Sequence, residues 1–157
     1  MSTELRPKIR AMSLFAEFTD DELEGLLDLV DTITVPPDTC IVKQDERGDC
    51  MYVLTDGSAK VSHNRDGKKF ELAVLEPGDF FGEIALVDEG PRSADVEALT
   101  PCSLMKIEHA ALRAVAGVYP SAAFKLLIAV GRVMVARMRR GNKKYIDSLL
   151  AAAVGKD

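Results

Sequence analysis

The sequence predicts an α+β protein in which a small antiparallel barrel or sandwich lies between helical ends. Apolar residues recur at helical spacing up to about Val30 and again beyond Glu108. Between these positions, short runs rich in Val, Ile, Tyr and Phe alternate with turn residues. The 157 residues are enough for one domain with a core of its own. We therefore expect helices over residues 1–30, strands over 31–108 and helices over 109–157.

The N-terminal segment carries a clear helix start. Thr19-Asp20-Asp21-Glu22 has the Thr-x-x-Glu form of a capping box, in which the hydroxyl and the carboxylate each bind a backbone amide. The apolar residues that follow at helical spacing are Leu23, Leu26, Leu27 and Val30. Upstream, we expect Leu14, Phe15 and Phe18 to pack against this helix as a staple or short turn.

The strand segment is divided by turn residues. The predicted turns are Pro36-Pro37-Asp38, Glu46-Arg47-Gly48-Asp49, Asp56-Gly57, Asp66-Gly67 and Pro77-Gly78-Asp79. Asp66-Gly67 lies between the runs 59–64 and 70–75, and both turn residues tolerate a positive φ. These two runs therefore predict a β-hairpin.

The C-terminal segment predicts a short helix, Ala110 to Val118, broken at Tyr119-Pro120-Ser121. We expect Ser121 to cap a long helix from Ala122 to about Arg140. Its broad apolar surface comprises Phe124, Leu127, Ile128, Val130, Met134, Val135 and Met138. Glycine costs about 1 kcal/mol in a helix interior, so Gly141-Asn142 is expected to interrupt or end this helix. A second amphipathic piece follows, with Tyr145, Ile146, Leu149, Leu150 and Val154.

Composition narrows the function classes. Hydrophobic residues make up 47% and charged residues 29%, as in ordinary globular domains, and the net charge of −5 argues against non-specific binding to a nucleic acid backbone. Three cysteines without a CxxC pair argue against a disulfide framework or zinc site and favour a reducing cytoplasm. Residues 1–10 lack the apolar core of a signal peptide, and the run 126–130 is too short to span a bilayer. We expect a soluble cytoplasmic protein without membrane insertion.

Enzyme chemistry has little support in the sequence. His63 and His109 are the only histidines, and they lie in unrelated segments. A metal site in a small β-barrel usually needs several histidines together. No Ser-His or Cys-His nucleophile pattern is present either. We expect no metal and no enzymatic activity.

The segment Phe81-Gly82-Glu83-Ile84-Ala85-Leu86 is followed by Pro91-Arg92-Ser93-Ala94, with the arginine nine residues after the glutamate. With Gly48, Tyr52, Gly57 and Gly78-Asp79, it resembles the phosphate-binding cassette of the cyclic nucleotide-binding domain family, which includes the cAMP receptor protein and protein kinase A regulatory subunits. The resemblance covers nearly the full length. It implies a jelly-roll-like antiparallel β-roll of about eight strands, N-terminal helices, a long C-terminal helix and a cassette at 81–94.

The resemblance also assigns roles to the cassette residues. Arg92 would bind the cyclic phosphate through paired, charge-assisted hydrogen bonds. Gly82, which has no side chain, would let the backbone come close to the phosphate. The backbone amides of the turn through Ile84 and Ala85 would face this anion. Glu83 would accept a hydrogen bond from the ribose 2′-hydroxyl. We expect Glu83 and Arg92 to act as a coupled pair; the alternative is a surface ion pair worth about 0–1 kcal/mol.

The base contacts are implied in the same way. Val61, Leu72 and Ala73 would form the wall against the purine, although core packing explains them equally well. From the last helix, Asn142 would hydrogen-bond the purine edge and Tyr145 would stack on it; solvated surface or helix packing is the alternative. Ser93 would reach the phosphate and could help hold a guanine, or it could simply cap a strand. We favour cAMP over cGMP because the Arg-Ser-Ala sequence resembles bacterial cAMP-binding regulators.

These features together predict a stand-alone sensory module that binds a cyclic nucleotide and moves its helices. Signalling would pass to an effector protein or to a homodimer mate, with Leu127, Met134 and Met138 on the candidate dimer surface. The alternative is a ligand-independent interaction scaffold of the same fold. The residues from Ile146 onward are too few for a helix-turn-helix, so we expect no direct DNA binding.

One positive cluster has no assigned role in this scheme. It comprises Arg137, Arg139, Arg140, Lys143 and Lys144. A solvated helix face accounts for it, and contact with RNA, lipid or an acidic partner is the alternative.

Overall fold

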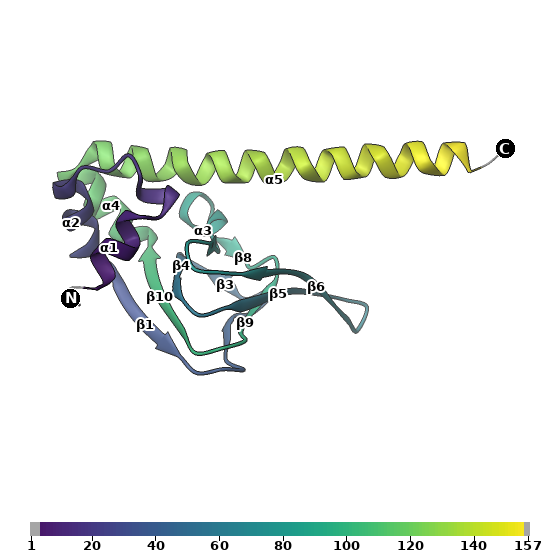
Figure 1. The fold of residues 1–157 in the computed structure, drawn as a ribbon, viewed down its shortest axis with the longest axis horizontal. Coiled ribbons are helices and arrows are strands. Elements are labelled where there is room, and N and C mark those ends of the chain that lie inside the picture. Colours follow the sequence, from purple (N-terminus) through teal and green to yellow (C-terminus); the bar gives the residue numbers. More distant parts are fainter. Residues whose placement is uncertain (1–3, 156–157) are drawn as a thin grey trace.

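The computed structural model describes residues 4–155, so the outer ends of the two predicted helical segments, 1–3 and 156–157, lie outside the described residues. The helices are α1 (Leu5–Arg10), the 3-10 turn η1 (Ser13–Phe15), α2 (Asp20–Leu27), α3 (Ile84–Val87), α4 (His109–Val118) and α5 (Pro120–Val154). The strands are β1 (Asp31–Val35), β2 (Cys40–Val42), β3 (Arg47–Gly48), β4 (Cys50–Asp56), β5 (Ala59–Arg65), β6 (Lys68–Leu75), β7 (Phe80–Phe81), β8 (Gly90–Pro91), β9 (Asp95–Ala98) and β10 (Cys102–Glu108). Figure 1 shows the β-roll below α5, with the N-terminal helices at one end.

The strands form antiparallel sheets, as predicted. One has the order β1-β10-β4-β7, a second the order β2-β9-β5-β6, and β3 pairs with β8. The predicted hairpin is confirmed, since β5 and β6 pair around Asp66 at φ 52° and Gly67 at φ 76°. The turn predicted at residues 46–49 is wrong. Asp45, at φ 68°, makes the turn instead, and the backbone of Glu46 then pairs with that of Arg92.

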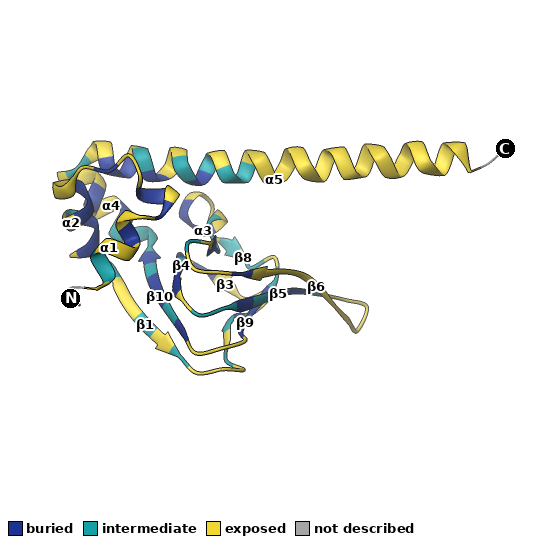
Figure 2. Ribbon diagram, viewed as in Figure 1, coloured by how far each residue is buried: buried dark blue, intermediate teal, exposed yellow. Residues whose placement is uncertain are grey.

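Two buried clusters stabilise the fold. One lies where the helices cover the sheet and includes Phe15, Leu23, Met51, Met105 and Leu126. The other fills the inside of the roll and includes Leu54, Ala59, Phe81, Val96 and Leu104. Figure 2 shows the buried residues concentrated at the helical end and along the inner strands. The predicted packing of Leu14, Phe15 and Phe18 is confirmed, since all three are buried.

The capping box at the start of α2 is confirmed: Thr19 Oγ1 accepts from the Glu22 amide at 3.2 Å, and Glu22 Oε1 accepts from the Thr19 amide at 3.1 Å. Ser121 does not cap α5, because that helix already begins at Pro120. The Ser121 hydroxyl instead donates to Glu22 Oε2 at 3.0 Å, so it ties α5 to α2.

Helix α5 is continuous over 35 residues and passes through Gly141 and Asn142, so the predicted interruption is wrong. One helix-interior glycine costs about 1 kcal/mol, and the good helix formers on both sides make propagation through it favourable. Every described residue from Val135 onward is exposed, and this half of α5 projects beyond the domain (Figures 1 and 2). None of the helices within residues 4–155 has both the length and the hydropathy to cross a membrane.

Candidate functional site

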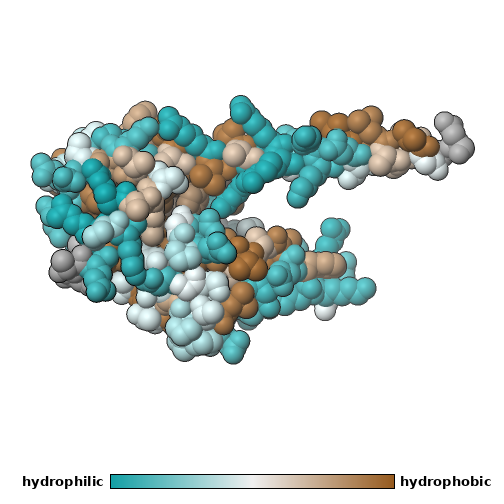
Figure 3. Space-filling view, viewed as in Figure 1, coloured by the Kyte–Doolittle hydropathy of each residue, from teal (hydrophilic) through white to brown (hydrophobic). Residues whose placement is uncertain are grey.

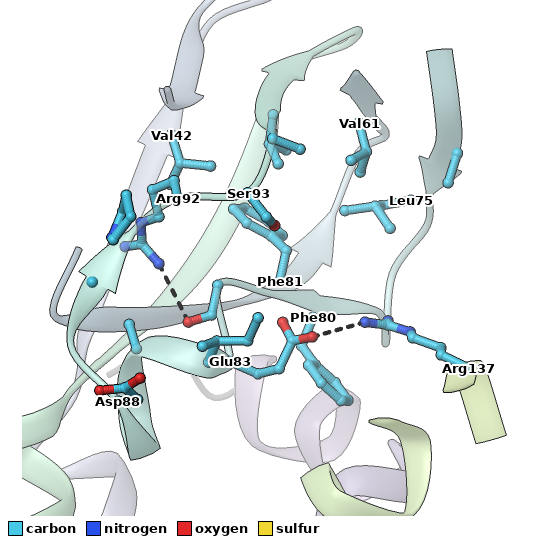
Figure 4. A pocket seen from close by; sticks show the side chains of 18 residues that line it. Val42, Val61, Leu75, Phe80, Phe81, Glu83, Asp88, Arg92, Ser93 and Arg137 are labelled. Atoms are coloured by element: carbon cyan, nitrogen blue, oxygen red, sulfur yellow. Dashed lines mark hydrogen bonds and ion pairs between the residues drawn. The ribbon is translucent and has the colours of Figure 1, made fainter. Parts of the chain in front are cut away.

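A cavity of about 290 Å³ opens between the strands of the roll and α5. Its walls come from β2, β5, β6, β9 and the segment from β7 through β8, and α5 contributes one residue, Arg137. Figure 4 shows aliphatic side chains on one side and charged groups on the other. The cavity brings together eight of the residues predicted for the site: Val61, Ala73, Gly82, Glu83, Ile84, Ala85, Arg92 and Ser93.

The segment that carries Glu83 is anchored from both sides. Phe80 and Phe81 before it are buried, and so are Ala85 and Leu86 of α3 behind it. Gly82 lies between them at φ 74°, a conformation that favours glycine. The Ala85 amide donates to the Gly82 carbonyl at 3.2 Å, which closes the first turn. The loop is therefore held rigidly, with Ile84 half exposed at the cavity.

Arg92 lies in a narrow slot of backbone. Its Nη1 donates to the Cys50 carbonyl at 2.8 Å and to the Gly82 carbonyl at 3.3 Å, and its Nη2 is 3.4 Å from Cys50 Sγ. A Cβ added at Gly48 would lie 2.1 Å from Arg92 Nε, and one at Gly82 would lie 2.4 Å from Nη1. Only glycine leaves room for the guanidinium at these two positions. A guanidinium has five N–H donors, so donors remain for an anion in the cavity.

Glu83 is paired with α5. Its Oε1 accepts a hydrogen bond from Arg137 Nη1 at 3.1 Å, and the Glu83 side chain is only 13% exposed. The Arg137 guanidinium also lies over the Phe80 ring, 5.3 Å from its centroid. Glu83 and Arg92 therefore do not form the surface ion pair that was the alternative interpretation, because Arg92 is held by backbone carbonyls (Figure 4). The sequence places Arg137 only in a basic cluster, and its position over Glu83 depends on how α5 packs.

The structure divides the predicted base wall. Val61 and Ala73 face each other across β5 and β6 and line the cavity, whereas Leu72 is 60% exposed and lies outside it. The pairing register shifts between Val61 and Ser62, and Leu72 is the β6 residue left unpaired by that shift. A bulge of this kind is not visible in a pattern of alternating residues. The apolar wall is completed by residues that the sequence reasoning missed, namely Val42, Leu75, Phe81 and Val96.

Asn142 and Tyr145 do not reach the cavity. Both are exposed, Tyr145 to 66%, and neither lines it. Helix α5 passes the cavity at Arg137, and Asn142 lies roughly 7 Å further along the helix axis. The prediction that these two side chains meet a ligand in their own subunit is therefore not supported by their positions.

The surroundings of Arg92 also include a phenol. Tyr52 stacks on Phe81 with ring centroids 5.3 Å apart. Burial raises the pKa of Tyr52 to about 12, and its contact with Cys50 acts in the same direction. Tyr52 is therefore neutral at physiological pH. The charged groups at the cavity are two guanidinium groups, Arg92 and Arg137, and two carboxylates, Glu83 and Asp88.

Comparison with known proteins gives a consistent result. The family described as the cyclic nucleotide-binding domain matches residues 32–118. The cAMP-activated global transcriptional regulator CRP of Escherichia coli is 31% identical over 132 residues, which cover 82% of this chain and 63% of that protein. The cGMP-dependent protein kinase egl-4 of Caenorhabditis briggsae is 35% identical over 92 residues, 57% of this chain and 12% of the kinase.

A solved structure agrees with these relatives. The N-terminal domain of a transcriptional regulator from Streptomyces coelicolor superposes with a TM-score of 0.71 and 33% sequence identity, over 86% of this chain and 92% of that one. The chain spans less than two thirds of the length of the curated relatives that it matches. The family match covers more than half of the chain and includes the segment that carries Glu83 and Arg92. This chain belongs to the cyclic nucleotide-binding domain family.

Proposed function

We propose that the cavity binds cAMP and that the chain acts as a cyclic nucleotide sensor. One observation carries the proposal: a single small cavity presents a guanidinium in a glycine slot, a nearly buried carboxylate and an apolar wall. Its volume of about 290 Å³ is near the lower end of the range for small-molecule sites, roughly 300–1,000 Å³. A cyclic nucleotide offers one phosphate charge, one ribose hydroxyl and one flat base, which these three features match.

Each group has a role in this proposal. Arg92 binds the phosphate with its remaining donors, joined by the Ser93 hydroxyl and the backbone amides of Glu83 and Ile84. Glu83 accepts the hydrogen bond of the 2′-hydroxyl. The base packs against Val61 and the other aliphatic residues of the wall. The Escherichia coli relative is named as cAMP-activated, which supports cAMP, and the kinase named as cGMP-dependent makes cGMP the second ligand to test.

The contact between Glu83 and Arg137 supplies a route from the cavity to α5. A ribose hydroxyl that binds Glu83 competes for the carboxylate that now accepts from Arg137. Occupancy of the cavity therefore alters how α5 is tied to the roll. A ligand shifts such an equilibrium only by the difference between its affinities for the two arrangements. Helix α5 then reports to an effector protein or to a second copy of the chain.

Calorimetric titration with cAMP and with cGMP tests the proposal. We expect micromolar or tighter binding, about −8 kcal/mol or better, for one of the two. Arg92→Ala should abolish the heat, whereas Arg139→Ala, an exposed arginine of α5 that does not line the cavity, should not. No heat with either nucleotide at two temperatures, from protein shown by extraction to carry no nucleotide, would refute the sensor and favour the ligand-independent scaffold.

A further inference from the structure

The hairpin of β5 and β6 projects from the roll below α5 (Figure 3), and the outer part of β5 has no strand beside it on one edge. Strand β9, its neighbour on that edge, begins at Asp95, which pairs with Ser62. The preceding residues, 92–94, line the cavity instead of extending the strand. Strand β5 nevertheless continues to Arg65. The backbone groups of residues 63–65 on this edge therefore need other hydrogen-bond partners.

The side chain of Gln44 takes the place of a strand on this edge. Its Nε2 donates to the Asn64 carbonyl at 3.0 Å, and its Oε1 accepts from the Asn64 backbone amide at 2.8 Å. One side-chain amide therefore makes the pair of hydrogen bonds that a residue of an antiparallel strand would make. Beside it, His63 Nδ1 donates to the Ser93 carbonyl at 2.9 Å, since a carbonyl oxygen only accepts. Side chains thus continue the pairing of β5 where β9 has ended.

Asp95 holds both partners of this pair. Its Oδ1 accepts from the backbone amide of Gln44 at 2.7 Å, and its Oδ2 accepts from Asn64 Nδ2 at 2.9 Å. The residue is only 7% exposed, and Lys69 Nζ lies 3.9 Å from Oδ2. Hydrogen bonds to a carboxylate are roughly twice as strong as those between neutral groups. We call the three residues Gln44, Asn64 and Asp95 the polar clasp.

The polar clasp lies directly beside the slot that holds Arg92. The next residue along the chain, Asp45, donates its backbone amide to the Arg92 carbonyl at 2.9 Å. The Glu46 carbonyl in turn accepts from the Arg92 backbone amide at 2.8 Å. Two residues further, Gly48 forms the wall of the slot, where an added Cβ would lie 2.1 Å from Arg92 Nε. The loop 44–48 therefore clamps the arginine, and the clasp fixes the start of this loop.

We propose that the polar clasp positions Arg92 for the phosphate, because it holds the loop 44–48 that keeps the guanidinium in its slot. The inference rests on the proposed function for the identity of the ligand. No member of the clasp lines the cavity, so all three are positioning residues. The clasp also ties the loop to β5, the strand that carries Val61 of the apolar wall. The phosphate end and the base end of the site are thereby kept at a fixed separation.

Cys50 supplies a measurement that needs no nucleotide. The residue is 3% exposed, and its Sγ lies 3.4 Å from Arg92 Nη2, so the guanidinium helps to cover the thiol. A second pocket, of about 210 Å³, is lined by both Arg92 and Cys50. A reagent in this pocket reaches the thiol once the guanidinium moves. Cys102, which is fully buried in the interior of the same roll, serves as the internal control.

Labelling with N-ethylmaleimide tests the clasp in the absence of ligand. A Cys40→Ser background removes the exposed thiol, and mass spectrometry of peptides separates the two buried ones. We expect Gln44→Ala to raise the labelling rate of Cys50 at least roughly tenfold and to leave that of Cys102 unchanged. An equal rise at both thiols would show general loosening of the roll, and an unchanged rate at Cys50 would show that Arg92 stays in place. Either result would overturn the proposal.

Calorimetric titration with cAMP tests the clasp by rescue with a conservative variant. Asp95→Ala should weaken binding at least roughly tenfold, because it removes both hydrogen bonds that the carboxylate accepts. Asp95→Asn should stay within about threefold of the wild type. Its Oδ1 still accepts from the Gln44 backbone amide, and the Asn64 side chain can turn over to accept from its Nδ2. Unchanged affinity in Asp95→Ala, or an equal loss in both variants, would refute the positioning role.

The positioning role and the sensor fail in different ways. Wild-type protein that binds no cyclic nucleotide refutes the sensor, and the labelling of Cys50 then still decides whether the clasp holds Arg92. Wild-type protein that binds cAMP, together with clasp variants that bind it equally well, refutes the positioning role alone. Arg92→Ala provides the reference for complete loss of the phosphate contact.

Discussion

Glu22 lies in α2 and joins that helix to α5. We expect its charge to contribute strongly to the stability of the fold. Its side chain is nearly buried, with the residue 4% exposed, and it accepts hydrogen bonds from Lys125 Nζ at 2.6 Å, Ser121 Oγ at 3.0 Å and the Thr19 amide at 3.1 Å. Burial alone would raise the pKa of Glu22. The hydrogen bonds from Lys125, Thr19 and Ser121 outweigh burial and lower that pKa to about 2.

The lowered pKa sets both the magnitude and the pH window. A pKa held at about 2 instead of 4.5 corresponds to about 3 kcal/mol of folding free energy. Because the pKa is lower in the folded state, this stabilisation is present above about pH 4.5 and is lost as the pH falls toward 2. Glu22→Gln keeps the shape and removes the charge. At pH 7 we expect it to cost about 2–3 kcal/mol, or roughly 5–10 °C in Tm.

Denaturant unfolding of the wild type and Glu22→Gln, from pH 7 down to pH 3, measures this contribution. The difference between the two proteins should shrink steadily below about pH 4.5. Asp21→Asn, an exposed change in the same helix turn, is the matched control and should remain within about 0.5 kcal/mol of the wild type. A difference that stays constant across this pH range would refute the reasoning, because the contribution would then not arise from the Glu22 charge.

Three further predictions concern the site and its helix. Gly48→Ala should weaken cAMP binding at least roughly tenfold, because the new Cβ would lie 2.1 Å from Arg92 Nε; Gly117→Ala, at an exposed position of α4 outside the cavity where an added Cβ meets no atom within 4 Å, should leave the calorimetric affinity unchanged. Gly141→Ala should stabilise the protein by up to about 1 kcal/mol, seen as a higher Tm; a lower Tm would show that α5 needs a break there. Arg137→Ala should bind cAMP yet lose the cAMP-dependent change in amide exchange along α5, and persistence of that change would exclude this route.

Parts of the fold can be predicted from the sequence because they depend on interactions between residues that are close together in the chain. The Thr19 and Glu22 capping box involves groups three residues apart, and the Asp66-Gly67 turn needs only two residues that tolerate positive φ. Both were predicted correctly because their energetics are contained in a short segment. The continuity of α5 is a different case. The local cost of Gly141 is small beside helix propagation and packing, which act over many residues.

The site shows the same division between local and long-range information. The glycine, glutamate and arginine of the cassette were found because their sequence resembles a known family motif, and they do line one cavity. The partner of Glu83 was not found, because Arg137 lies 54 residues away and reaches it only through the docking of α5. Leu72 was misplaced because one shift of strand register takes it out of the expected alternation. Contacts of this kind depend on the packed structure.

Amide hydrogen exchange of the full chain, with and without saturating cAMP, tests nucleotide binding in the cavity most directly. The proposed site predicts slower exchange in residues 80–94 and in the cavity strands 59–75, and no such change in Arg92→Ala. Protection confined to the basic segment 137–144, or an unchanged pattern in the cavity strands and cassette, would contradict it. In either case the nucleotide would not occupy the space between Glu83 and Arg92.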